Sequence, residues 1–137
     1  MVINFRGELI MITGIEHTGL VARDTEKLCG FYEKYFDCKV ILSYPNGTKF
    51  LKCHNGIIEV YPMKSDDENT YDNYVKGLRH LAFETDDFDK DREMLLAAGV
   101  KPAAEPIIKD TMKLALFYDP EMNLFHLIQR PESLLSL

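Results

Sequence analysis

Two predicted strands in this chain repeat one another, and this repeat limits the fold more than any other feature. IEHTGL contains His17 and LRHLAF contains His80, each at the third position of its strand. The same offset places Asp24 on Asp87, and an apolar pattern of helical period follows each aspartate. A period of about sixty residues is too long for a solenoid repeat, so the chain is interpreted as a duplicated module.

Each copy predicts the element order βαβββ. In the first copy a strand at about 15–22 precedes a helix capped by Asp24, and strands are expected near 38–43, 48–53 and 57–61. In the second copy a strand at 78–84 precedes a helix at about 88–98, and strands are expected near 100–104, 113–118 and 123–129. The helix of the second copy should be capped by Asp86 or Asp87 and should end at Gly99.

The expected domain organisation follows from the repeat. The chain divides into an N-terminal extension, one domain of two modules joined by an acidic linker, and a short tail: 1–12, then 13–131 with modules 13–62 and 77–131 and linker 63–76, then 132–137. The extension fits neither copy, and Met11 leads straight into the first strand. We therefore expect Met11 to be the natural start and residues before it to be an over-extended N-terminus.

Composition narrows the class of protein. A length of 137 residues suits one compact domain, and 46% apolar with 28% charged residues is ordinary for a globular protein. The formal net charge of −6 argues against nucleic acid and anionic membranes as partners, and we expect neither. The N-terminus has no signal-peptide pattern, so a cytoplasmic protein is expected. Cys29, Cys38 and Cys53 are odd in number without CxxC spacing, which predicts reduced thiols.

The last strand of each copy also carries a side chain able to bind metal. Glu59 lies in IIEVY, 42 residues after His17, and His126 lies in LFHLI, 46 residues after His80. A strand histidine alone is more often a satisfied polar group, but a carboxylate in an apolar strand is costly without a cation or a proton. Four such groups at matched positions predict one divalent metal site. His54 is left out because it sits at a predicted turn.

The ordered set of these segments resembles the vicinal-oxygen-chelate superfamily, the group of glyoxalase I, bleomycin-resistance proteins and ring-cleaving dioxygenases. The similarity runs from about residue 15 to 130 and includes GLRHLAF and DPEMNLFH. It implies an α+β fold in which two βαβββ modules form a cupped, mostly antiparallel eight-stranded sheet with helices on its outer face. It also implies a small-molecule substrate, a homodimer, and one divalent metal, with Ni, Zn, Co or Mn expected before Fe.

One position departs from the resemblance. Glyoxalase I usually has a carboxylate where this chain has His126, and that group takes part in proton transfer. Three neutral imidazoles and one carboxylate leave a divalent ion with a residual charge of about +1, which makes it a stronger Lewis acid. Glu59 is then the catalytic base expected for a lactoylglutathione lyase-like or isomerase reaction on a 2-oxo compound or its thiol adduct.

Three other functions stay open at this stage. An Fe(II) ring-cleaving dioxygenase is one. The resemblance disfavours it, because the metal-binding carboxylate of these dioxygenases lies on the last strand, where this chain has His126. Non-catalytic sequestration of a small molecule is another. Thiol transfer to a phosphonate antibiotic is the third, and it would need a cradle for which the candidates are Arg23, Lys49, Lys52 and Lys113. No glutathione or coenzyme A cradle is recognisable, and the site could form within one chain or across a dimer.

Overall fold

The alternating apolar pattern of the strands becomes two separate mixed sheets. The computed structural model describes residues 2–3, 5–7, 9–10, 16–64, 78 and 80–136. The first sheet has four strands in the order β3 (Thr18–Ala22), β6 (Gly56–Pro62), β5 (Lys49–Cys53), β4 (Lys39–Ser43). The second has five, in the order β7 (His80–Glu84), β11 (Leu124–Gln129), β10 (Met112–Tyr118), β8 (Lys101–Pro102), with β9 (Ile107–Lys109) paired to β10.

Each helix begins where its capping aspartate predicts. Helix α1 (Thr25–Phe36) starts after Asp24, whose side chain accepts a hydrogen bond from the Lys27 amide at 3.0 Å. Helix α2 (Phe88–Ala97) starts after Asp87, whose side chain accepts from the Lys90 amide at 3.2 Å. Such caps satisfy an amide that has no partner within the helix. In the described part of the chain, no helix combines the length and apolar character that crossing a membrane requires.

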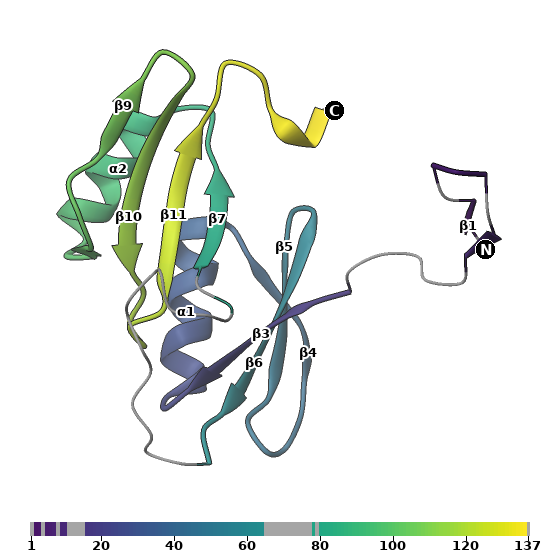
Figure 1. Ribbon diagram of the computed structural model, residues 1–137. Helices are drawn as coiled ribbons and strands as arrows, with labels where there is room; N and C mark the ends of the chain where they lie inside the picture. Colours follow the sequence, from purple (N-terminus) through teal and green to yellow (C-terminus); the bar gives the residue numbers. More distant parts are fainter. Residues whose placement is uncertain are drawn as a thin grey trace.

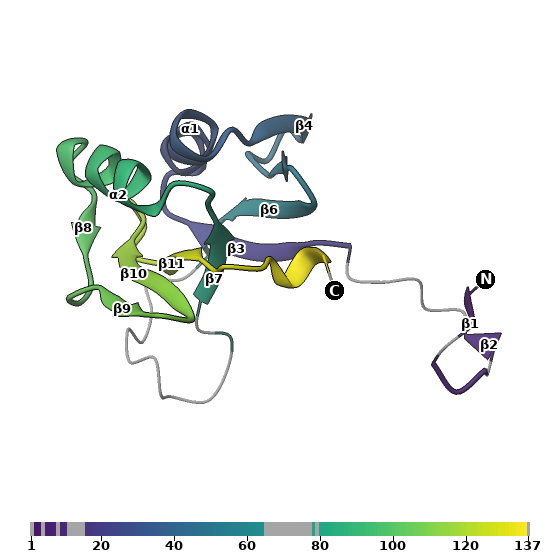
Figure 2. The same cartoon turned by 90° about the horizontal axis from the view of Figure 1, so that it is seen from above.

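Helix α1 packs between the two sheets and forms much of the core. Figures 1 and 2 show it lying between the β3–β6 edge and the β7–β11–β10 group, with α2 on the same side of the second sheet. The ring of Phe36 contacts Phe83 of β7 and Phe125 of β11, at centroid distances of 4.4 and 5.2 Å. The same core cluster contains Leu51 and Val60 from the first sheet. The faces of the two sheets that point away from the helices are called the open faces below.

A buried carboxylate fastens α1 to the second module. Asp119, 2% exposed, accepts hydrogen bonds from the Tyr32 hydroxyl at 2.8 Å and from the amides of Glu121 and Asn123. Burial raises the pKa of the Asp119 carboxyl, and these hydrogen bonds act in the opposite direction. Glu121, in the same turn, accepts from the backbone amide of Asp24 at 2.7 Å. The turn at 119–123 therefore holds the start and the middle of α1.

The α+β prediction of paired βαβββ modules is confirmed, with two differences. The strands form a four-stranded and a five-stranded sheet, so a single eight-stranded cup is not what the chain shows. Strand β9 was not expected, and it pairs with β10 beyond the short β8. Most of the predicted linker, residues 65–76, lies outside the described residues. In the N-terminal extension β1 (Val2–Ile3) and β2 (Leu9–Ile10) pair as a small sheet of their own, away from the rest in Figures 1 and 2; η1 (Leu134–Ser136) falls in the tail.

The expectation of three reduced thiols is wrong for two of the cysteines. Cys38 and Cys53 form a disulfide, with Cα atoms 4.3 Å apart. Strands β4 and β5 pair Lys39 with Lys52, so the two cysteines face each other one step further along the hairpin. Composition could not reveal this because the pairing depends on hairpin register. Cys29 is a free, buried thiol, and burial raises its pKa to about 11.

Replacing Tyr32 by phenylalanine should destabilise the protein by about 1.5–3 kcal/mol, because a buried carboxylate loses one of its donors. Urea unfolding followed by circular dichroism measures this. Tyr35→Phe removes a hydroxyl from a half-buried ring of the same helix and should cost less than about 0.5 kcal/mol. Equal losses in the two variants would show that the Tyr32–Asp119 hydrogen bond does not hold the modules together.

Candidate metal centre

The first sheet brings His17 and Glu59 together. Strands β3 and β6 run parallel, and the register pairs Gly19 with Glu59. His17 lies two residues before Gly19, on the same side of the strand, so its side chain can reach across to Glu59. His17 Nε2 lies 3.4 Å from Glu59 Oε2. Both side chains are on the open face, because their neighbours Ile58 and Val60 are buried beneath α1.

The second sheet brings His80 and His126 together in the same way. Strands β7 and β11 run parallel, and the register pairs Ala82 with His126. His80 lies two residues before Ala82, as His17 lies two residues before Gly19. The two imidazole rings stack with centroids 3.8 Å apart and an interplanar angle of 14°. The duplication predicted from sequence is thus repeated in the register of the ligand-bearing strands.

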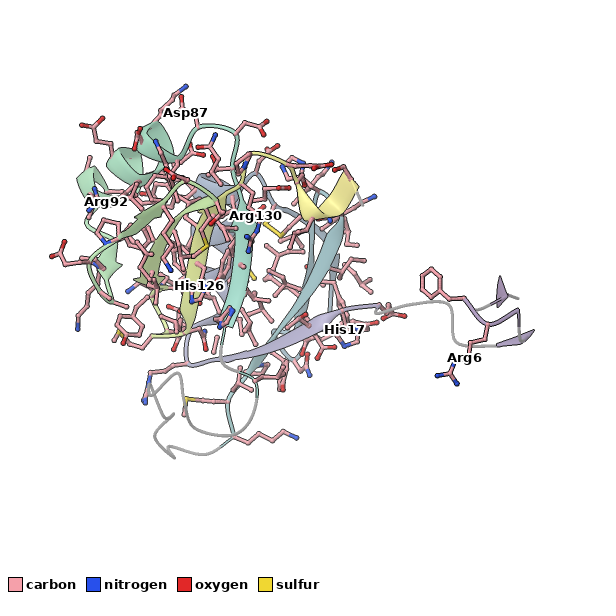
Figure 3. All side chains as sticks on the ribbon, turned by 45° about the horizontal axis from the view of Figure 1, so that its top comes forward. Arg6, His17, Asp87, Arg92, His126 and Arg130 are labelled. Carbon is pink, nitrogen blue, oxygen red and sulfur yellow. A yellow bond between two sulfur atoms is a disulfide. The ribbon has the colours of Figure 1, made fainter. Side chains whose placement is uncertain are left out.

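The four side chains form two pairs in a single chain, not one cluster. In Figure 3, His17 projects from β3 and His126 from β11, on different sheets. Among the described residues no group of three or more His, Cys, Asp or Glu side chains is placed to hold a metal ion. The repeat correctly indicates which residues become neighbours within each module. It says nothing of how the two pairs come together.

The environment of His126 keeps its ring neutral. The side chain is buried, with 9% exposure, and burial together with the neighbouring His80 lowers its pKa from 6.5 to about 4. Its Nε2 atom is buried and has no hydrogen-bond partner. A buried nitrogen left unpaired is costly, and in a native protein it calls for an explanation, of which a bound ion is one.

These side chains suit a divalent metal ion. Neutral imidazole nitrogens and a carboxylate are ordinary ligands of Zn²⁺, Ni²⁺, Co²⁺ and Mn²⁺. Metal coordination would give a partner to the unpaired Nε2 of His126 and to the Glu59 carboxylate beside His17. Each pair alone offers two ligands, which is fewer than the three or four that protein sites for these ions usually provide.

Three residues near the first pair were not found by sequence reasoning. The Glu16 carboxylate lies 2.9 Å from His17 Nδ1, on the side of the ring opposite Glu59. Phe50 packs edge-on against His17, at a centroid distance of 5.5 Å. The ring of Tyr61 lies over Gly19, where an added Cβ would approach it to 3.2 Å. Gly19 therefore leaves room for the Tyr61 ring. The alternation of side chains along β6 is the one sequence signal that could have placed this tyrosine on the same face as Glu59.

Two of the basic residues suggested as an anion cradle, Lys49 and Lys113, point away from the site. Lys49 pairs with Glu26 of α1 at 3.0 Å, and Lys113 pairs with Asp89 of α2 at 3.0 Å, so both point to the helices. Lys52 is exposed and follows Phe50 on the open face by strand alternation. His54 lies in the β5–β6 turn and lines a cavity of about 310 Å³ between α1 and α2, away from the four candidate ligands.

Comparison with known proteins gives a family and several folds of the same kind. Residues 14–127 match the model of the Glyoxalase/Bleomycin resistance protein/Dioxygenase superfamily. Fosfomycin resistance protein FosX from Listeria monocytogenes is 26% identical with a TM-score of 0.72, over 92% of this chain and 98% of that one. A FosX structure with Mn(II) and sulfate is 27% identical, with a TM-score of 0.70 over 90% of this chain and 94% of that one.

Lactoylglutathione lyase from Agrobacterium tumefaciens shares the fold at 19% identity. Its TM-score is 0.65, over 88% of this chain and 96% of that one. The search of curated proteins returned no significant match.

In the metal-free protein the pKa of His126 should be about 4. An NMR titration of its ring measures this. Because the folded state then binds fewer protons than the unfolded state between pH 4 and 6.5, stability should fall as the pH is lowered through this window. His80→Gln removes the smaller of the two causes and should raise the pKa of His126 only part of the way. A His126 that titrates at 6.5 in the wild-type protein would contradict its burial.

Proposed function

Because the chain belongs to the Glyoxalase/Bleomycin resistance protein/Dioxygenase superfamily, we propose that it is a metal-dependent enzyme of the glyoxalase I type. Its substrate would be a small 2-oxo compound, or the thiol adduct of one, with two neighbouring oxygens. The observation that carries this proposal is that each open face holds two candidate ligands, brought together by parallel strands in equivalent registers. The buried, unpaired Nε2 of His126 supports the same reading.

The complete ligand set would require two chains. In this arrangement His17 and Glu59 of one protomer face His80 and His126 of the partner, and a homodimer holds two equivalent sites. Each chain contributes two ligands to each site. This accounts for a chain that carries two candidate ligands on each of two different sheets.

The exposed apolar surface of the first sheet supports such docking. Val21, Leu42 and Tyr44 are each nearly half exposed. Leu42 is paired with Phe50, which is in turn paired with Glu59, so this surface continues outward from the ligand pair. Contiguous exposed apolar side chains beside polar ligands are typical of a surface that another protein covers.

Glu59 is the residue proposed to move the proton. It is the one carboxylate among the four candidates, and His17 lies on one side of it. A bound divalent ion supplies a Lewis acid that polarises the substrate oxygens and acidifies the adjacent C–H. Glu59 would accept that proton and return it to the neighbouring carbon, and a partner docked on the open face would exclude water from the exchange.

A FosX-type reaction is the second candidate. FosX structures are 24–27% identical to this chain, and one of them holds Mn(II) and a dihydroxypropylphosphonic acid, which carries two adjacent oxygens. A phosphonate would need cationic partners on the open face. Lys52 is placed there by alternation, whereas Lys49 and Lys113 are paired with carboxylates of the helices. We therefore rank proton transfer on a 2-oxo compound first.

Elemental analysis of tag-free protein should find about one equivalent of Ni, Zn, Co or Mn per chain. His80→Ala should abolish tight metal binding because it removes a ligand. His54→Ala changes a histidine in an exposed turn and should leave binding intact. Equal metal retention in both variants would exclude the proposed ligand set.

Turnover of methylglyoxal with a thiol would support the first function. Iron with oxygen uptake on a catechol would redirect the assignment to an oxygenase. Tight ligand binding without turnover would indicate sequestration.

Mixing two inactive variants tests whether each site uses two chains. After unfolding and refolding together, His17→Ala and His80→Ala chains should form mixed dimers with one intact site and one site lacking both histidines. Because about half of the dimers are mixed, about a quarter of an equivalent of metal should be recovered per chain. A site built within one chain would bind no metal in any mixture.

A further inference from the structure

Glu16 holds the outer edge of the His17 ring. Its Oε1 atom lies 2.9 Å from His17 Nδ1, while His17 Nε2 faces Glu59 Oε2 at 3.4 Å. A carboxylate accepts hydrogen bonds and has no proton to donate, so the proton of this contact belongs to Nδ1. In a neutral ring the lone pair is then on Nε2, the nitrogen that faces Glu59, so that both side chains could bind one metal ion.

We propose that Glu16 is a positioning residue that orients His17 as a metal ligand and adds a second negative charge to the centre. This inference rests on the proposed metal site. Metal-binding histidines commonly donate their other ring N–H to a carboxylate, which fixes the tautomer and the ring plane and makes the histidine a stronger ligand. Phe50 contacts the same ring edge-on, so the ring is held by a packing contact and by a hydrogen bond.

The charge of the proposed metal centre explains why a carboxylate at position 16 would matter. Glu59 is the one carboxylate among the four candidate ligands, so a divalent ion keeps a charge of about +1. Glu16 brings the total of the ion, its ligands and this carboxylate to zero. The candidate ligands other than Glu59 are imidazoles, so Glu16 would add the missing negative charge from the side of His17.

Exposure sets the size of the expected effect. The Glu16 side chain is 82% exposed, and exposed ion pairs contribute little to the stability of a fold. Glu16 should therefore matter little for folding. Its effect should appear in metal affinity, where loss of a partner of this kind typically costs 10- to 100-fold.

The test measures the dissociation constant of Zn²⁺ by chelator competition in purified full-length protein. Glu16→Gln keeps an acceptor oxygen but loses the charge, and Glu16→Ala loses both. We expect about tenfold weaker binding for glutamine and a larger loss for alanine. Urea unfolding of both metal-free variants should match the wild type. Glu26→Gln, which removes an equally exposed carboxylate paired with Lys49, is the matched control and should leave Zn²⁺ affinity unchanged.

A second readout does not need metal. Long-range ¹H–¹⁵N spectra of the metal-free protein at mildly alkaline pH should show a larger share of the Nδ1–H tautomer of His17 in the wild type than in Glu16→Ala, because Glu59, on the Nε2 side, is the acceptor that remains in the variant. Unchanged affinity in both Glu16 variants, or an equal loss in Glu26→Gln, would overturn the role of Glu16 while leaving the metal site standing. A wild-type protein that binds no Zn²⁺ would overturn both proposals, whatever the tautomer.

Discussion

Parallel pairing of the first and last strand of each module is the constraint on which the arrangement depends. The crossover from β3 to β6, and from β7 to β11, places the two ends of each βαβββ module side by side. A side chain near the start of the module thereby meets one from its end, more than forty residues later. Hairpins alone would pair neighbours in sequence, and His17 would never reach Glu59.

Features of this fold whose determinants are local or repeated could be predicted from the sequence. Asp24 and Asp87 act within one turn of the helices they begin, so their roles could be read directly. The candidate residues on the first and last strand of each module could be picked out because the duplication supplies a second observation of the same position. Gly99, at a φ of +80°, ends its helix as expected because this backbone region favours glycine.

Features that depend on strand register or on contacts between modules could not be predicted from the sequence. The Cys38–Cys53 disulfide follows from β4–β5 pairing that contains an irregularity between residues 40 and 42. The division into two sheets depends on which edge strands pair, and β3 pairs with β6 and β7 with β11, each within its own module. The contact of Glu16 with His17 joins adjacent residues, yet no alternation pattern predicts that neighbours on a strand will touch. The four ligands themselves stay a prediction.

The helix side and the open faces of the two sheets differ in how fully their polar side chains are paired. Around α1 even the buried hydroxyl of Tyr32 has a hydrogen-bond partner, the carboxylate of Asp119. On the open faces each sheet presents two candidate metal ligands. If the sites are shared, a cell that makes both normal and altered chains would assemble hybrid molecules whose two centres differ. An alteration at His17 and one at His80 would then behave as separate, mutually correcting defects although both lie in one polypeptide.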